Sequence, residues 1–257
     1  MSWTPMRRLY ERDPLRHFLV WLALYLGISI IALNLEGALD LPGHTVVAIP
    51  LAMLAVVITL YLVRSGVGRD IGLGVRPAVT LRRMWFYLPL VVLVALPLIN
   101  GLRADLTVLL IVAMVVHYVA SGYLEEVLFR GLLLTHLLRE WPATSAILLS
   151  ALTFGLGHAT SMLAGQSGAD TIWQVINATA VGLLFTLVVV ATGSLTAVIV
   201  AHVFYNIIAE SAQVPEGLGV ILTGLAVLAV YGPWLLYGAG GLARLRAQAQ
   251  ASGATDH

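Results

Sequence analysis

The sequence predicts an all-α, polytopic integral membrane protein with about eight transmembrane helices. Of its 257 residues, 60% are hydrophobic and only 11% are charged. The mean hydropathy is +0.94. Globular domains carry about 25% charged residues, so the composition argues against a water-soluble fold. In addition, apolar runs of about 20 residues, the length that a helix needs to cross a bilayer, recur along the chain.

Eight segments meet this length requirement within a few residues. They cover residues 18–35, 45–63, 84–99, 106–129, 145–163, 172–191, 195–210 and 218–237. The chain contains no low-complexity linker and no convincing internal repeat. We therefore expect one membrane domain over residues 1–257.

The distribution of basic residues predicts the orientation, because cytoplasmic loops carry an excess of them. All fourteen basic residues are arginines. Those flanking one set of loops are Arg7, Arg8, Arg12, Arg16, Arg64, Arg69, Arg76, Arg82, Arg83, Arg139, Arg244 and Arg246. The alternate loops hold Glu36, Asp40, Asp170 and Glu216, with Arg103 as the exception. This asymmetry predicts that both termini are cytoplasmic.

Other features of the composition exclude whole classes of function. The chain has no cysteine, which excludes disulfides, thiolate metal sites and a cysteine nucleophile. Its formal net charge is +1, and nothing in this balance indicates a nucleic-acid partner. The bilayer is the partner that the composition predicts.

The stretch SGYLEEVLFRG, residues 121–131, places ionisable groups inside the fourth apolar segment. Such groups cost roughly 2.5–3.5 kcal/mol each at membrane depth on insertion scales. Glu126 and Arg130 are four residues apart and share a helix face, so they can pair. Glu125 lies about 100° away around the helix and is free to face something else. A structural ion pair that fixes helix packing is the alternative interpretation.

Two further segments contain polar residues at the same spacing. Phe154 and His158 lie in the fifth segment, and His202 and Asn206 lie in the seventh. Each pair alone could simply hydrogen-bond between helices. Together the three segments supply a carboxylate, two imidazoles, an amide and an ion pair, which is the inventory that hydrolysis requires.

The motifs EEVLFR (125–130), FGLGH (154–158) and HVFYN (202–206) occur in this order on successive apolar segments. This pattern resembles the CPBP family, which includes type II CAAX prenyl endopeptidases and bacteriocin-processing or immunity-type membrane proteins. The motif-bearing core covers residues 106–210. The resemblance implies an intramembrane endopeptidase that hydrolyses a peptide bond of a membrane-associated substrate.

The resemblance also implies roles for individual residues. Glu125 would be the general base that activates water, assisted by His158. His202 and Asn206 would form the oxyanion hole. Glu126 would pair with Arg130 and hold the helix, with Phe154 as a further structural residue of the motifs. No metal or other cofactor is expected in this version of the mechanism.

Three alternatives stay open at this point. The first is a zinc-dependent protease in which Glu125, His158 and His202 are the metal ligands. The second is a non-enzymatic immunity or scaffold protein of the same family. The third is a proton-coupled transporter, although the chain lacks an obvious pair of broken helices in repeated halves.

The exclusive use of arginine is compatible with a GC-rich bacterium, so we expect a bacterial plasma membrane with an active site accessible from the cytoplasmic side. The sequence does not identify the substrate, whether it is prenylated, or the oligomeric state.

Overall fold

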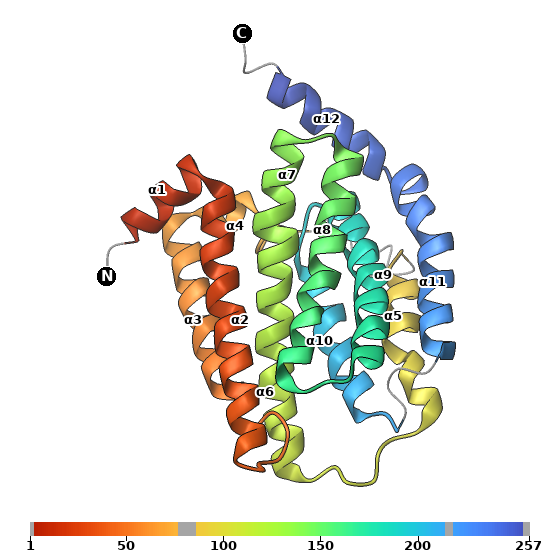
Figure 1. Cartoon of the computed structure of the whole chain (residues 1–257). Coiled ribbons are helices and arrows are strands. Elements are labelled where there is room, and N and C mark those ends of the chain that lie inside the picture. Colours follow the sequence, from red (N-terminus) through yellow and green to blue (C-terminus); the bar gives the residue numbers. More distant parts are fainter. Residues whose placement is uncertain (1–2, 77–85, 214–217, 254–257) are drawn as a thin grey trace.

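The protein is described here by a computed structural model covering residues 3–76, 86–213 and 218–253. In these parts of the chain the fold is all-α (Figure 1). The α-helices are α1 (Thr4–Arg12), α2 (Pro14–Ala38), α3 (Ala48–Ser65), α4 (Val67–Asp70), α5 (Leu88–Ala95), α6 (Val108–Glu125), α7 (Leu134–Glu140), α8 (Ala143–Gly157), α9 (Gly168–Thr192), α10 (Thr196–Ser211), α11 (Leu218–Pro233) and α12 (Gly241–Gly253). Four tighter or wider helical segments continue them, namely the 3₁₀ segments η2 (Leu96–Asn100) and η4 (His158–Ala164) and the π segments η3 (Glu126–Leu133) and η5 (Trp234–Gly238).

Five helical stretches are long and apolar enough to cross a membrane: Pro14–Ala38, Ala48–Ser65, Val108–Glu140, Ala143–Ala164 and Gly168–Thr192. A sixth arises if the bent pair Gly224–Gly238 and Gly241–Ala247 forms one span. The apolar helices Leu88–Ile99 and Thr196–Ser211 are shorter. The polytopic all-α class is therefore confirmed, whereas the described residues support five or six spans by length rather than eight. The expected start of the third span at residue 84, together with Arg82, Arg83 and Glu216, lies outside the described residues.

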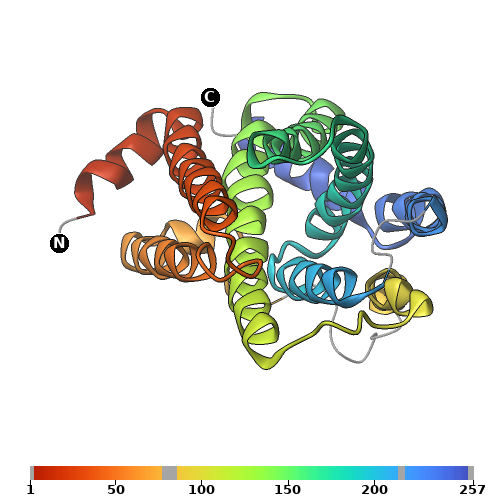
Figure 2. The ribbon, with the colours of Figure 1, turned by 60° about the horizontal axis from the view of Figure 1, so that its bottom comes forward.

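The stretch Val108–Glu140 forms one long rod through the middle of the molecule. Figure 2 shows this rod between α2 and α3 on one side and the group formed by α8, α9 and α10 on the other. Helices α3 and α10 pack against α6, and α2 packs against η3. The rod thus carries the first motif to the place where the other two helix groups meet.

Local signals in the sequence explain where several helices begin. The side chain of Asp13 accepts a hydrogen bond from the Arg16 N–H at 2.9 Å, ahead of Pro14 at the first position of α2. Thr107 caps α6 through the N–H of Leu110 at 3.2 Å. Capping side chains of this kind satisfy backbone donors that a helix leaves free at its start.

Glu36 differs from the sequence-based expectation. It lies in α2 rather than in a loop, and its side chain is buried. Its two carboxylate oxygens accept the backbone N–H groups of His44 at 2.7 Å and Val46 at 2.9 Å. The carboxylate therefore orders the connection from α2 to α3, which apolar periodicity does not reveal.

Small residues allow the helices around the site to approach closely. A Cβ at Gly155 of α8 would lie 1.9 Å from the Thr179 Oγ1 atom and 3.0 Å from the Thr179 nitrogen on α9. A Cβ at Gly122 of α6 would lie 3.3 Å from the Val203 nitrogen on α10. Both contacts involve backbone atoms, so these two glycines set how near the three motif-bearing helices come to one another.

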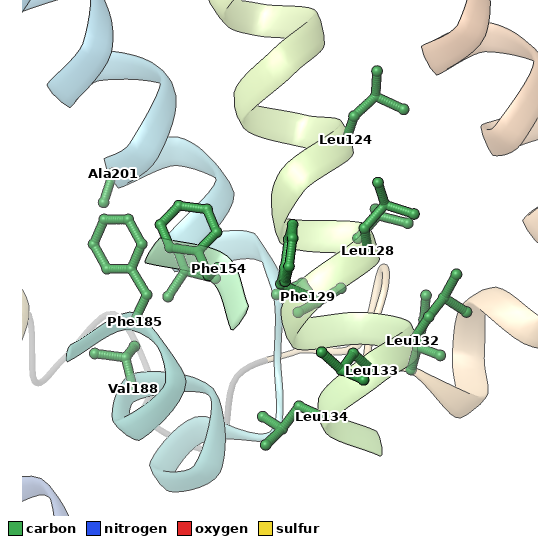
Figure 3. Close-up of a cluster of buried hydrophobic side chains, with 14 of the residues drawn as sticks. Leu124, Leu128, Phe129, Leu132, Leu133, Leu134, Phe154, Phe185, Val188 and Ala201 are labelled. Carbon is green, nitrogen blue, oxygen red and sulfur yellow. The ribbon is translucent and has the colours of Figure 1, made fainter. Parts of the chain in front are cut away.

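Apolar side chains from several helices fill the space beside η3. Figure 3 shows Leu128, Phe129, Leu132 and Leu133 of η3 in this cluster. Phe154 of α8, Phe185 and Val188 of α9 and Ala201 of α10 face the rod from the other side (Figure 3). All of these side chains are buried.

Candidate active site

The structure brings all three motifs together. The Arg130 guanidinium nitrogen Nη1 lies 2.8 Å from the Glu126 Oε1 atom. Nδ1 of His202 lies 2.7 Å from that same oxygen. The ring of Phe154 contacts those of His158 and His202, with centroids 5.0 and 5.8 Å apart. Residues up to 76 positions apart in the sequence therefore form one cluster, and the expected pairing of Glu126 with Arg130 is present.

The two adjacent glutamates stand at a change of helix type. Glu125 is the last residue of α6, and Glu126 is the first residue of the π segment η3. We expected an ordinary α-helix through residue 129. A π-helix bonds each N–H one residue further back than an α-helix does, and such segments are often found at functional sites. The Glu126–Arg130 pair forms despite the altered register.

The Glu126–Arg130 pair is fully withdrawn from solvent, with both side chains 0% exposed. The Arg130 guanidinium carbon also lies 4.0 Å from the centroid of the Phe154 ring, so the cation contacts an aromatic face as well as a carboxylate. Gly182 of α9 leaves room for this arrangement, since a Cβ there would lie 2.7 Å from Phe154 and 2.9 Å from Arg130. Arg130 thus balances the charge of one glutamate only.

Glu125 occupies a different environment from Glu126. Its Oε1 atom accepts a hydrogen bond from the Tyr25 hydroxyl of α2. Its Oε2 atom lies 3.5 Å from the His202 Nε2 atom. The side chain is 12% exposed and lines a cavity. Glu125 is therefore the carboxylate that a substrate or water in this cavity can reach.

Tyr25 is a residue that sequence reasoning missed. It lies 100 positions before Glu125, in an apolar helix that carries none of the three motifs. It is buried, and the Ser29 hydroxyl donates to its backbone carbonyl at 2.8 Å. A tyrosine in an apolar run has no distinguishing signal in a single sequence, so only the packing of α2 against the rod reveals the contact.

His158 also departs from the expected geometry. Helix α8 ends at Gly157, and His158 begins the 3₁₀ segment η4. Its Nδ1 atom lies 3.1 Å from the Phe154 carbonyl oxygen. A carbonyl can only accept, so Nδ1 carries the proton and Nε2 of the neutral ring is an acceptor. His158 lines the same cavity as Glu125.

The cavity has a volume of about 300 Å³. Glu125, His158 and Asn206 line it, and His202 does not. Both ring nitrogens of His202 instead face carboxylates, that of Glu126 and that of Glu125. A direct oxyanion contact from His202 therefore stays a prediction, and the resting geometry favours a role in holding the two glutamates.

The residues proposed for a zinc site do not form a ligand set. Among the described residues, no three histidine, aspartate or glutamate side chains are grouped so that they could hold a metal ion. His202 directs one nitrogen to Glu126, which is itself bonded to Arg130. The donor geometry therefore does not fit the zinc-dependent alternative.

A second polar cluster lies at the far end of the cavity. Glu210 of α10 accepts from the Arg103 Nη1 atom at 3.0 Å and from the Tyr118 hydroxyl at 3.2 Å. Arg103 also donates twice to Asp105, at 2.7 Å each, and this pairing lowers the pKa of the Asp105 carboxyl. His117 and Tyr118 line the cavity together with Glu210. These residues connect the loop before α6 to the end of α10.

Comparison with known proteins agrees with the motifs. Residues 107–208 match the model of the family described as "Type II CAAX prenyl endopeptidase Rce1-like". The matched segment includes Glu125, Glu126, Arg130, Phe154, His158, His202 and Asn206. Searches among curated proteins and among solved structures gave no match. Over residues 107–208, the chain is therefore similar to the Rce1-like family of type II CAAX prenyl endopeptidases.

Proposed function

We propose that the protein is an intramembrane endopeptidase in which Glu125 activates the attacking water. The observation that carries this proposal is the difference in environment between two adjacent carboxylates. Glu126 is bonded to Arg130 and His202 in a closed core, whereas Glu125 lines the cavity. A purely structural ion pair needs Glu126 and Arg130 only, so the second carboxylate calls for a separate function.

In the proposed reaction the Glu125 carboxylate takes a proton from a water molecule in the cavity as its oxygen attacks the peptide carbonyl. The C=O electron pair moves onto the oxygen and gives a tetrahedral oxyanion. Glu125 then returns the proton to the leaving amine as the C–N bond breaks. The products are a carboxylic acid and an amine, and Glu125 ends in its starting state.

The neighbouring residues fit supporting roles in this reaction. The Asn206 carboxamide can donate to the oxyanion, because Asn206 lines the same cavity as Glu125. The Nε2 atom of His158 is an acceptor that can orient the water. The Tyr25 hydroxyl donates to one oxygen of Glu125, and the His202 Nε2 atom lies 3.5 Å from the other. We propose positioning roles for both of these residues.

The substrate class proposed here is a membrane-associated peptide or protein. The cavity lies among helices that are long and apolar enough to cross a bilayer. A prenylated peptide is one candidate within this class. The family match makes it the first probe to use, alongside peptides without a prenyl group.

The test is hydrolysis by the purified, detergent-solubilised protein. A quenched fluorogenic prenyl-peptide and a set of unprenylated membrane peptides are assayed with wild type, Glu125→Gln and Glu210→Gln. Glu210 is a matched control because it is a partly buried glutamate lining the same cavity. We expect Glu125→Gln to abolish hydrolysis and Glu210→Gln to retain most of it.

Two outcomes would contradict the proposal. One is hydrolysis by Glu125→Gln at the wild-type rate. The other is a folded wild-type protein that cleaves none of the peptides, which would favour the non-enzymatic scaffold. Thermal unfolding of each variant in the same detergent shows whether a loss of activity is merely a loss of folding.

A further inference from the structure

The cavity is closed at one end by packed side chains. All eight residues of η3, Glu126–Leu133, are buried, and so are Leu134 and Leu137 of the helix that follows. Figure 3 shows Phe129 of this stretch beside Phe154, with Leu128 and Leu132 on the opposite side of the rod. Interiors of this kind are close-packed and exclude water. The packed side chains therefore close the cavity towards the α7 end.

The opposite end of the cavity is the exposed one. From Glu125 the lining continues past Ser121 to Tyr118 and His117, about two helical turns or ~12 Å back towards the start of α6. The rim there includes Ala164, which is exposed, and Glu210, whose side chain is 32% exposed against 12% for Glu125. Exposure therefore increases from Glu125 towards the loops 101–107 and 165–167.

A lateral exit between α2 and η4 is closed at this level. The Asn34 side chain donates to the Leu163 carbonyl at 3.0 Å and to the Ile30 carbonyl at 2.8 Å. This contact ties the second half of α2 to η4. The rim residues His117, Tyr118 and Glu210 lie in the first half of the rod and at the end of α10, and these parts of the two helices are at the lower end of the molecule in Figure 1.

The arginines mark the closed end. Among the described residues, ten arginines lie in or beside α1, the start of α2, the end of α3, α4, the end of α7 and α12. Helices α1 and α12 lie at the upper end in Figure 1, away from the open rim. Arg103 is the one described arginine at the rim, and it is bonded to Asp105 and Glu210. Excess basic residues mark the cytoplasmic side of a membrane protein.

We propose that the catalytic cavity opens to the non-cytoplasmic side of the membrane, so that the substrate is a membrane-anchored peptide presented from that side. This inference rests on the proposed function only in calling the peptide a substrate. The position of the cavity mouth does not depend on catalysis. It replaces our sequence-based expectation of cytoplasmic access. The two statements conflict because the arginines and the cavity mouth lie at opposite ends of the same helices.

The charged side chains at the rim also predict the charge of the peptide that binds. One guanidinium, that of Arg103, faces two carboxylates, those of Asp105 and Glu210. This set leaves the mouth with a formal excess of negative charge, and like charges disfavour an approaching acidic segment. We therefore expect the residues beside the cleaved bond to be neutral or basic.

The absence of cysteine from the sequence permits a direct test. Three single-cysteine variants are made in the full chain: Ser29→Cys in the cavity wall, Ala164→Cys at the rim, and Glu140→Cys at the arginine-rich end. Each is treated with a small, membrane-impermeant trimethylammonium methanethiosulfonate, in intact bacterial cells and in inside-out membrane vesicles. Protected thiols are then counted by a gel shift with a polyethylene-glycol maleimide.

We expect Ala164→Cys and Ser29→Cys to be modified in intact cells, and Glu140→Cys to be modified only in inside-out vesicles. Modification of Ser29→Cys or Ala164→Cys from the vesicle side alone would overturn the proposal, as would modification of Glu140→Cys in intact cells. If Ser29→Cys resists the reagent from both sides, the Ala164→Cys result decides. The readout needs no hydrolysis, so failure of the protease proposal leaves this result intact, and the reverse also holds.

Discussion

Replacing Arg130 with methionine tests whether the buried ion pair is structurally essential. Methionine keeps much of the side-chain volume and removes the cation. Glu126 would then keep one partner, the Nδ1 atom of His202 at 2.7 Å, at a site that is 0% exposed. Removing one member of a buried pair costs about 3–5 kcal/mol, because it strands the other charge. We expect Arg130→Met to lower the free energy of unfolding by that amount.

The same chain offers a matched control. Arg7 and Glu11 have the same four-residue spacing and the same 2.8 Å separation, but their side chains are 45% and 53% exposed. Exposed pairs of this kind contribute about 0–1 kcal/mol. Arg7→Met should therefore change the unfolding free energy by less than about 1 kcal/mol. Burial is then the variable that separates the two results.

The assay is reversible unfolding in mixed micelles with increasing sodium dodecyl sulfate, followed by tryptophan fluorescence. The double variant Glu126→Gln/Arg130→Met completes a mutant cycle, since glutamine can still accept from His202 but carries no charge. It should be more stable than Arg130→Met alone, with a coupling of about 0.5–3 kcal/mol. A cost below about 1 kcal/mol for Arg130→Met, or additive single effects, would refute the reasoning.

Three further outcomes are expected. Tyr25→Phe removes the hydroxyl donor to Glu125 and should lower kcat about tenfold or more with little change in KM, because hydrogen bonds to charged groups contribute about 1.5–3 kcal/mol. Tyr123→Phe is the control, since the Tyr123 hydroxyl lies 2.7 Å from the Thr59 hydroxyl instead, and it should leave kcat within about twofold. Equal effects in the two variants would contradict the assignment. Gly155→Ala places a Cβ against the α9 backbone and should prevent stable folding, judged by thermal unfolding, whereas Gly37→Ala, where a Cβ meets nothing within 4 Å, should be neutral. Treatment with phenanthroline should leave peptide hydrolysis unchanged, and a chelator-sensitive activity restored by zinc would instead support the metal-dependent alternative.

The sequence predicted those features that follow from polarity and spacing. Apolar runs place most helices within a few residues, because the bilayer length constrains them. The pairing of Glu126 with Arg130 follows from their four-residue spacing. Glu125, His158 and Asn206 line one cavity, as expected if polar groups in spans turn towards a common interior.

Features that depend on hydrogen-bond register or on contacts distant in the sequence were not predicted. The apolar pattern of residues 126–133 does not indicate the change from α-helix to π-helix at Glu126. The end of α8 before His158 likewise carries no proline or capping signal. Tyr25 reaches Glu125 only through the packing of α2 against the rod. The side of access stays a prediction, and the proposal above differs from it because loop charges orient the chain but do not show at which end a cavity opens.

The change of helix type at the site has a further consequence. Glu125 and Glu126 are neighbours in sequence, yet one lines a cavity and the other is sealed among Arg130, His202 and Phe154. The wider π segment begins between them, and its eight residues are all buried. One continuous helix therefore exposes the Glu125 carboxylate to the cavity on one side and closes the protein towards the arginine-rich end on the other. The buried pair makes this compatible with the membrane, because Arg130 compensates the one charge that the seal must enclose.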